Sequence, residues 1–420
     1  MKKFLMTACI SLFFLTSAGL AADKNDKNDK NCALCHDQHS SGAHKNLECV
    51  ECHSQNSEHF DKAANFATEA KGCLSCHENY SGMMHSAMVH RESEKKFVHK
   101  TFNGIDNNFY DKNCKNCHVT SCTDCHQKGD AHEISKPDTD TCQKCHRDYY
   151  IGIEYTGLGQ REDHERYDRG IEQNGSKYAS MLPDIHHEKG MNCSDCHSME
   201  SLAKGQVSSK SCTDCHTPDK SIIEHSIAAH MEKMECYTCH SAWANQEYGT
   251  FWIKLEDTAF DEYFRWVKRP HIDYAKSSHT KEYTKFPIAV NKAGKYSPIR
   301  PEYITFLTHV KGDKVQGTEN RMISNFYKAV FPHTIRRETV TCEQCHKTPK
   351  RFMRETRQER IFDLQKDGLM VDSFYNMRWY RLSNGRFADD DEFERIMTES
   401  PEYQKLIVKK WQQIIKSLSN

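Results

Sequence analysis

Cysteine and histidine recur in one fixed pattern along this 420-residue sequence. Twenty of its 21 cysteines form pairs separated by two residues, and a histidine follows the second cysteine of every pair. The paired cysteines are Cys32 and Cys35, Cys49 and Cys52, Cys73 and Cys76, Cys114 and Cys117, Cys122 and Cys125, Cys142 and Cys145, Cys193 and Cys196, Cys212 and Cys215, Cys236 and Cys239, and Cys342 and Cys345. The histidines that follow them are His36, His53, His77, His118, His126, His146, His197, His216, His240 and His346.

This pattern, Cys-x-x-Cys-His, is the attachment signature of c-type haem. Its two thiols can add to the two vinyl groups on one edge of a porphyrin, and the next residue then points an imidazole at the iron. Zinc sites and redox disulfides also use Cys-x-x-Cys, but neither needs a histidine directly after it. Histidine fills 26 of 420 positions, so chance does not place it after all ten pairs. The sequence predicts ten covalently bound haems c with the motif histidines as proximal ligands.

The histidines outside the motifs are candidates for the second axial position of each iron. His44 lies five residues before Cys49, and His230 lies six before Cys236. A histidine so close upstream cannot easily bend back onto its own haem, so we expect it to ligate a neighbouring one. Of the adjacent His186 and His187, we expect only one to bind iron. The distal candidates are His39, His44, His59, His85, His90, His99, His132, His164, His187, His225, His230, His309 and His333.

Ligation by two histidines has a functional consequence. A six-coordinate iron has no open position for a substrate, so it can pass electrons but cannot readily bind an oxyanion. Methionine is the competing axial ligand and raises the potential, although it more often fills gaps in packing. A second histidine ligand on every iron favours electron transfer over substrate chemistry. No catalytic residue is predicted.

The composition points to a core that the chain does not supply alone. Mean hydropathy is -0.83, with 37% hydrophobic and 28% charged residues. A chain this polar buries too little apolar surface to offset its ordering entropy, so we expect the haems to form the core. The predicted fold is mainly α with much irregular loop and few short strands. The net charge of -1 provides no basic footprint for nucleic acid.

The N-terminus has the pattern of an export signal. Lys2 and Lys3 precede an apolar stretch over 4–15 and small residues follow, so we expect a signal peptide over 1–22 and a periplasmic protein. A helix that spans a membrane needs about 20 apolar residues, and this stretch is shorter. An uncleaved anchor is the alternative. The charged repeat over 23–31 predicts a disordered linker.

The spacing of the motifs divides the rest of the chain. Nine motifs lie within 32–240, which predicts a nine-haem domain with a sub-boundary or structured insertion over 147–192. The region 241–420 holds the tenth motif. Its first part, 241–341, contains 17 aromatic residues and no cysteine. These aromatic residues either pack around haem faces or build a docking surface beside the tenth haem, where His309 and His333 are the expected ligands.

The C-terminal end predicts a helix. Ser400 and Pro401 form a helix start, with serine as the cap and proline in the first turn. An apolar stripe that includes Trp411 follows. We expect this helix to pack on the haem domain, with a partner or membrane surface as the alternative.

The ten motifs and the histidines upstream of them resemble those of the periplasmic multihaem c-type cytochromes of anaerobically respiring bacteria, over about 32–240 and 342–346. The haem density also resembles that of octahaem tetrathionate reductases, hydroxylamine oxidoreductases and ammonia-forming nitrite reductases. The Cys-x-x-Cys-Lys variant that marks the catalytic haem in many nitrite reductases is absent from this sequence. The resemblance implies electron exchange with redox partners such as quinol-oxidising complexes, terminal reductases or other cytochromes.

Three functions remain open at this point. The first is electron transfer through ten haems. The second is reduction of an oxyanion such as tetrathionate, nitrite or selenite at one open-site haem, where cationic residues stabilise the anion. Arg336, Arg337, Lys350 and Arg351 flank the tenth motif and could serve there. The third is a cytochrome subunit of a quinol-oxidising membrane complex, attached through the C-terminal helix.

Overall fold

The computed structural model describes 44–47, 51, 71–115, 119–127, 132–146, 153–155, 171–173, 176–180, 184–206, 208–242, 246–258, 268–281, 286–337, 340–354 and 380–419. The predicted signal peptide and linker lie outside these residues. So do the motifs at Cys32 and Cys49, with Cys117, His118, His39, His59 and His164. Seven motifs are described completely.

An eight-stranded mixed sheet dominates the second half of the chain. Its main path runs β10-β9-β8-β4-β6-β5, and β7 joins β8 and carries β11. The strands are β4 (Gln246–Glu256), β5 (Lys268–His271), β6 (Tyr274–Lys281), β7 (Ile288–Asn291), β8 (Tyr296–Lys311), β9 (Lys314–Ala329), β10 (Arg381–Leu382) and β11 (Gly385–Arg386). A smaller sheet has the order β1-β3-β2, from β1 (Ile153–Tyr155), β3 (Ser176–Ser180) and β2 (Ile171–Gln173).

The central strand β8 explains how the sheet holds together. It pairs parallel with β4 and antiparallel with β9, so nearly all its described side chains are buried or half-buried, as expected of a strand covered on both faces. Gly312 has φ 56° and starts the two-residue turn into β9, as a type II′ hairpin turn requires. Pro301, which cannot donate to a ladder, lies at a register shift.

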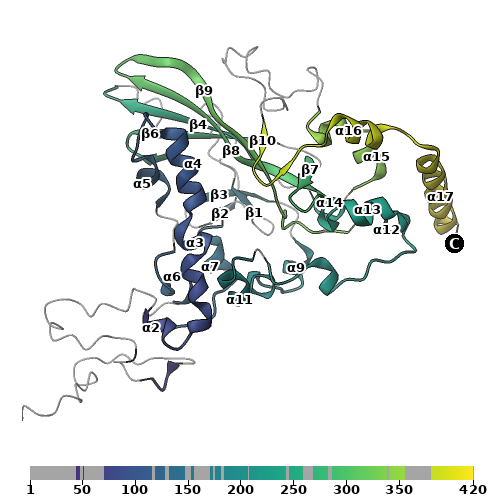
Figure 1. Cartoon of the computed structure of the whole chain (residues 1–420), viewed down its shortest axis with the longest axis horizontal. Helices are drawn as coiled ribbons and strands as arrows, with labels where there is room; N and C mark the ends of the chain where they lie inside the picture. The colour runs from purple at the N-terminus through teal and green to yellow at the C-terminus, as the bar shows by residue number, and fades with distance from the viewer. Residues whose placement is uncertain are drawn as a thin grey trace, which may run out of the picture.

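Two helices cover one face of this sheet. They are α4 (Glu92–Phe102) and α5 (Phe109–Asn113), and both lie beside the ribbon of β4 and β6 in Figure 1. Phe102 and Phe109 stack with ring centres 3.5 Å apart, and the buried Tyr274 and Leu307 complete the cluster. The aromatic residues of 241–341 that the structure describes therefore serve mostly as sheet core.

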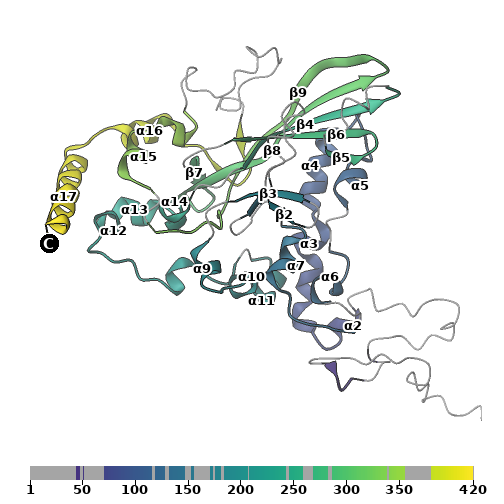
Figure 2. The same ribbon diagram turned by 180° about the vertical axis from the view of Figure 1, so that it is seen from behind.

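Short helices carry the motifs, and they follow one another across the molecule from α2 through α6, α7 and α10 to α14 and α15 (Figures 1 and 2). The helices other than α4 and α5 are α2 (Lys71–Leu74), η3 (Glu78–His85), α3 (Ala87–His90), α6 (Thr123–His126), α7 (Thr139–Gln143), α9 (Ile185–Glu188), α10 (Cys193–Cys196), α11 (Met199–Ala203), η5 (Cys212–Asp214), α12 (Ile223–Ser226), α13 (Ala228–Lys233), α14 (Cys236–His240), α15 (Cys342–His346), η7 (Pro349–Phe352), α16 (Asp390–Met397) and α17 (Pro401–Leu418).

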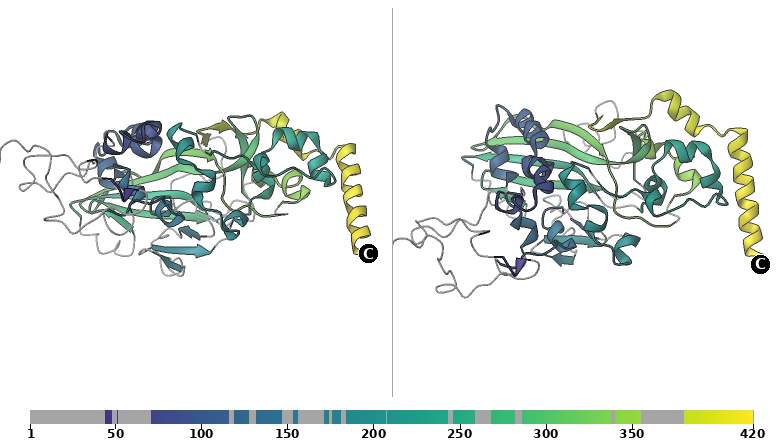
Figure 3. Two further views of the ribbon diagram at one scale, coloured as in Figure 1. Left: turned by 90° about the horizontal axis from the view of Figure 1, so that it is seen from below. Right: turned by 60° about the horizontal axis from the view of Figure 1, so that its bottom comes forward.

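The C-terminal helix α17 confirms the predicted start. The Ser400 hydroxyl accepts a hydrogen bond from the Tyr403 backbone N–H at 3.1 Å, and Pro401 occupies the first turn. Figure 3 shows α17 standing away from the sheet, at the end of the molecule that holds α15 and α16. Trp411 is 58% exposed, whereas Tyr403 at the start of the helix lies against His346, with ring centres 4.9 Å apart. Packing of this helix on the haem domain stays a prediction. Within the described residues, no helix is both long and apolar enough to cross a bilayer.

The predicted fold class is wrong. A mainly α chain with few short strands was expected, whereas β8 and β9 each span 16 residues within the eight-stranded sheet. The physical reason is that 241–341 builds its own apolar core from residues such as Phe306 and Tyr327, both fully buried. The low overall hydropathy averages this segment with the polar motif regions.

Candidate haem-attachment sites

Each of the seven completely described motifs forms one turn of helix. In five motifs the histidine N–H donates to the carbonyl of the first cysteine at 2.9 to 3.0 Å, for example from His77 to Cys73. His240 and His346 end the helices α14 and α15 in the same way. This turn makes the two thiols and the imidazole project from a single compact segment, as attachment to one porphyrin edge requires.

Side chains inside the motifs fix this turn. The residue just before the second cysteine bonds back to the backbone N–H before the first cysteine, which is the reciprocal contact of a capping box. The pairs are Asn192 with Asp195 at 2.7 Å, Ser211 with Asp214 at 2.7 Å, and Thr341 with Gln344 at 2.8 Å. None of the cysteines that the structure describes is joined to another in a disulfide.

Five motif histidines face a histidine from elsewhere in the chain. The ring-centre distances fall within a narrow range, from 5.9 to 6.2 Å. The pairs are His44 with His77 (6.2 Å), His186 with His216 (5.9 Å), His333 with His197 (6.1 Å), His225 with His240 (5.9 Å), and His230 with His346 (6.1 Å).

This distance fits an iron between two imidazoles. A metal–imidazole bond is about 2 Å long, and the ring centre lies about 1 Å beyond the nitrogen, so two axial imidazoles have centres about 6 Å apart. Edge-to-face ring pairs in direct contact also reach this distance, as Phe97 and Phe326 do at 6.2 Å. What points to iron is that the distance recurs at five motif histidines. The residues present therefore fit haem iron. A haem held there would supply a metal that gains or loses one electron.

The second ring nitrogen of several of these histidines is held by the protein. Metal-bound histidines commonly donate their other N–H to a carbonyl or carboxylate, which fixes the ring. Nδ1 of His126 lies 3.0 Å from the Ser135 carbonyl, and Nδ1 of His346 lies 2.7 Å from the Ile396 carbonyl. The same contact joins His225 to the Asp219 carbonyl at 3.1 Å. Nε2 is then the nitrogen that these rings have available to bind iron.

Burial favours the neutral form of three of these rings. Burial, followed by the charge of His197, lowers the pKa of His333 to about 4. Burial also lowers the pKa of His230 and of His240. Neutral imidazole is the form that binds a metal, so the environment favours the ligand state over the charged state.

The sequence missed one residue of these sites. Asp184 caps α9, and its carboxylate accepts a hydrogen bond from Nδ1 of His186 at 2.8 Å. Of the two adjacent histidines, His186 faces a motif histidine, although His187 was the predicted candidate. The aspartate two residues before His186 was the available signal, because such a residue can cap a helix and hold the ring.

Several other histidines that were predicted as distal ligands have different surroundings. The rings of His85 and His90 are 6.0 Å apart at 16°, and neither belongs to a motif. His99 stacks on Tyr110 with ring centres 6.5 Å apart. Nδ1 of His187 and of His132 is buried.

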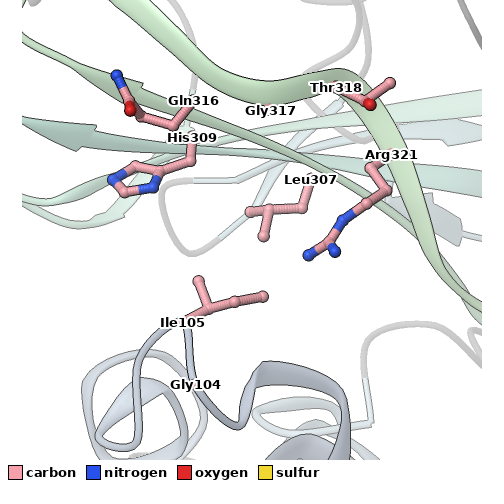
Figure 4. Close-up of a pocket in the computed structure, with 8 residues that line it drawn as sticks. All are labelled: Gly104, Ile105, Leu307, His309, Gln316, Gly317, Thr318 and Arg321. Atoms are coloured by element: carbon pink, nitrogen blue, oxygen red, sulfur yellow. The ribbon is translucent and has the colours of Figure 1, made fainter.

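His309 and His333 do not face the tenth motif, where they were expected. His333 faces His197. His309 lies on β8 with Nε2 3.0 Å from Oε2 of Glu256. It lines a cavity of about 330 Å³ between the β8–β9 hairpin and the Gly104–Ile105 turn (Figure 4). Arg321 also lines this cavity.

The cationic residues near the tenth motif have structural contacts. Arg336 forms an ion pair with Glu188, with Nη1 2.7 Å from Oε2. Arg351 is 4% exposed and donates to the Thr238 carbonyl at 2.9 Å, which ties η7 to α14. Both side chains therefore help to hold motif-bearing segments in place.

Comparisons with known proteins agree with this reading of the sites. Residues 160–256, which include the motifs at Cys193, Cys212 and Cys236, match the Class III cytochrome C family. The match supports the predicted resemblance to multihaem c-type cytochromes over this segment of the chain. Such proteins exchange electrons with redox partner proteins.

Two further comparisons add little. Among solved structures, the chain is similar to octahaem cytochrome c from Shewanella oneidensis. The identity is 13%, the TM-score is 0.36, and the match covers 76% of this chain and 97% of that chain. No curated protein matches at a significant level.

Proposed function

We propose that this chain transfers electrons through ten covalently attached haems c, most of them held by two histidines, in anaerobic respiration. Export through the N-terminal signal places it in the periplasm, where haem c is attached. Its partners are a quinol-oxidising complex, a terminal reductase or other cytochromes. It passes electrons and has no substrate chemistry of its own.

One observation carries the proposal. Five non-motif histidines each face a different motif histidine, at a distance that suits an iron between them. Two imidazoles on one iron leave no position for a substrate, while the iron can still change its oxidation state. The lowered pKa of the buried rings, with Nδ1 held on several other histidines, supports the same role.

The haem count is the first test. The intact mass of the exported protein should exceed that of the processed polypeptide by ten haems, and the signal segment should be missing. A smaller excess would contradict the count. An excess of zero, in cells that mature other c-type cytochromes, would reject haem attachment altogether.

Ligation is tested by low-temperature EPR of the oxidised protein. The rings of His44 and His77 lie at 87°, whereas those of His230 and His346 lie at 28°. Nearly perpendicular axial imidazoles give a strongly anisotropic low-spin signal, and nearly parallel ones give a rhombic signal, so both should appear. His44→Ala should remove intensity from the first class, and His230→Ala from the second.

The same EPR experiment also tests the alternative that the protein is an enzyme. A high-spin ferric haem that shifts on addition of cyanide or nitrite would identify an open position. In that case reduction of an oxyanion would replace simple electron transfer as the function. We expect neither anion to change the spectrum of the oxidised protein.

A further inference from the structure

Arg351 is a buried positive charge with an incomplete set of partners. It is 4% exposed, and among the buried residues that the structure describes only Asp184 also carries a formal charge. Arginine stays protonated in proteins and presents five N–H donors. One of these, on Nη2, donates to the Thr238 carbonyl at 2.9 Å. Nε and Nη1 are buried, and neither has a hydrogen-bond partner within the described part of the chain.

Other arginines in this region are paired with carboxylates. Nη1 of Arg336 lies 2.7 Å from Glu188, and Nη1 of Arg354 lies 2.6 Å from Asp390. These two arginine side chains are 23% and 26% exposed, so water also solvates their charge. Arg351 is more deeply buried, and among the described residues its one hydrogen bond goes to an uncharged carbonyl.

A buried charge without a counter-charge is unfavourable. The loss of its hydration is offset only by an opposite charge and by hydrogen bonds to the remaining donors. The Thr238 carbonyl supplies one hydrogen bond and no charge. An ordered water could accept from Nε or Nη1, but it would also bring no charge. The site therefore calls for an anion, and a carboxylate is the anion that a guanidinium binds most readily in proteins.

The backbone of η7 directs the Arg351 side chain inward. Pro349 lies in the first turn, and Met353 ends the helix in the left-handed region with φ 62°. Phe352 and Met353 are 3% and 1% exposed and belong to two apolar clusters. The turn cannot rotate to carry Arg351 into water without exposing these neighbours.

The guanidinium lies between two motifs. Arg351 comes five residues after His346 of the tenth motif. Its acceptor Thr238 lies between Cys236 and Cys239 of the ninth motif. Figure 1 shows α14 and α15, which carry these two motifs, at the same end of the molecule. Haems attached at these motifs are thus the groups that would supply an anion here.

We propose that Arg351 binds a propionate carboxylate of the haem attached at Cys236 or of the haem attached at Cys342. This inference rests on the proposed function, because it takes each of these motifs to hold a haem. Every haem c carries two propionates, and these are the carboxylates that haem attachment adds to this part of the molecule. The contact gives the buried guanidinium its counter-charge and holds the propionate in place.

The pair also affects the potential of that haem. An ionised propionate favours ferric over ferrous iron, because the ferric state carries one more positive charge. Arg351 offsets the negative charge of the propionate and so keeps the potential higher. Hydrogen bonding and burial around a haem are among the means by which a protein sets its potential.

The test measures haem potentials of the full haem-loaded chain by spectroelectrochemical titration. Arg351→Met removes the charge and the donors, and should lower the equilibrium constant for reduction of one haem by at least about tenfold, which is about 59 mV for a one-electron couple. Arg351→Lys keeps the charge and should lower the constant less. Arg354→Met is the matched control, because it removes a charge three residues away that already has Asp390 as its partner. It should leave the potentials unchanged.

Two further backgrounds identify the haem that supplies the propionate. His225→Met marks the haem of His240, and His230→Met marks the haem of His346, because loss of a distal imidazole changes the spectrum of that haem. The shift caused by Arg351→Met should appear on one of the two marked haems. A crystal structure of the haem-loaded wild type should show Nε or Nη1 within hydrogen-bond distance of a propionate of the same haem.

The proposal is overturned if neither haem shifts, if Arg351→Met and Arg354→Met cause equal shifts, or if the guanidinium contacts no propionate in the crystal structure. Should Arg351→Met not assemble, the lysine variant and the crystal structure decide. Equal haem content in the variants, measured by intact mass, is the control for attachment. Absence of covalent haem from the wild type would instead reject the proposed function, so the two failures are distinguishable.

Discussion

The Asp184 carboxylate should lower the potential of the haem held by His186 and His216. This carboxylate is 4% exposed. Its Oδ1 lies 2.8 Å from Nδ1 of His186, and its Oδ2 accepts the Ile335 backbone N–H at 3.0 Å. By contrast, the histidine rings of His126, His225, His240 and His346 have their Nδ1 contacts with backbone carbonyls.

The direction of the change in haem potential follows from the negative charge of the Asp184 carboxylate. A carboxylate acceptor makes the imidazole a more basic ligand, and a buried negative charge favours the ferric iron over the ferrous iron. A hydrogen bond to a charged group contributes about 1.5–3 kcal/mol. For a one-electron couple, about 60 mV corresponds to about 1.4 kcal/mol. If most of that energy differs between oxidation states, Asp184→Asn should raise the potential of this haem by roughly 50–130 mV.

Spectroelectrochemical titration monitored by EPR can resolve the change, because one haem among ten should move. Asparagine keeps the volume and still caps α9, so the fold should survive. Asp219→Asn is the matched control, since His225 bonds to the backbone carbonyl of Asp219 and not to its side chain. A shift below about 20 mV, or a shift of equal size in the control, would refute the role of the carboxylate.

Three further predictions concern the sheet and the C-terminal end. Phe306→Ala should lower the free energy of unfolding by about 3–5 kcal/mol in urea titrations, because Phe306 is fully buried; the control Val315→Ala, at a side chain 44% exposed, should change it by less than about 0.5 kcal/mol. The Arg386 guanidinium holds the pKa of Glu392 at about 2, below its ordinary value of 4.5. The stabilisation is therefore complete above 4.5 and is lost as the pH falls toward 2, so Glu392→Gln should lower Tm at pH 6 but not at pH 2. Trp411→Ala should weaken sedimentation with anionic vesicles several-fold, because Trp411 is exposed on a helix that also carries lysines; wild-type protein that fails to sediment would rule out membrane docking through α17.

The attachment sites could be predicted because their chemistry is local. A motif places both thiols and the proximal imidazole within five residues, and one hydrogen bond winds them into a turn. The number of residues between a histidine and the next motif also indicates which motif histidine it can face. His230, six residues before Cys236, faces the histidine of another motif, whereas His225, eleven residues before it, has enough chain to face His240. The prediction that a close upstream histidine serves a neighbour follows from chain length alone.

The sheet, and the pairing of His333 with His197, could not be predicted from local motifs. The residues of β8 are buried almost throughout, so they lack the alternation that marks a strand. His333 was assigned to the tenth motif because that motif is close in sequence. It faces His197 instead, because the segment after β9 crosses the motif region, where the Thr334 hydroxyl donates to the Ala242 carbonyl at 2.6 Å and the Ile335 N–H donates to Asp184. Such contacts depend on the whole fold.

The sheet also explains how so polar a chain can hold its motifs at fixed separations. The start of β8 binds α14 directly, since the Tyr296 carbonyl accepts from the Glu235 N–H at 3.0 Å and from the Thr238 hydroxyl at 2.8 Å. Farther along the same strand, Leu307 packs in the cluster with α4 and α5. One continuous strand thus connects the motif at Cys236 to the helices just before the motif at Cys114. Because a paired strand resists bending more than a loop does, the sheet can keep distant haems at the separations on which electron transfer depends.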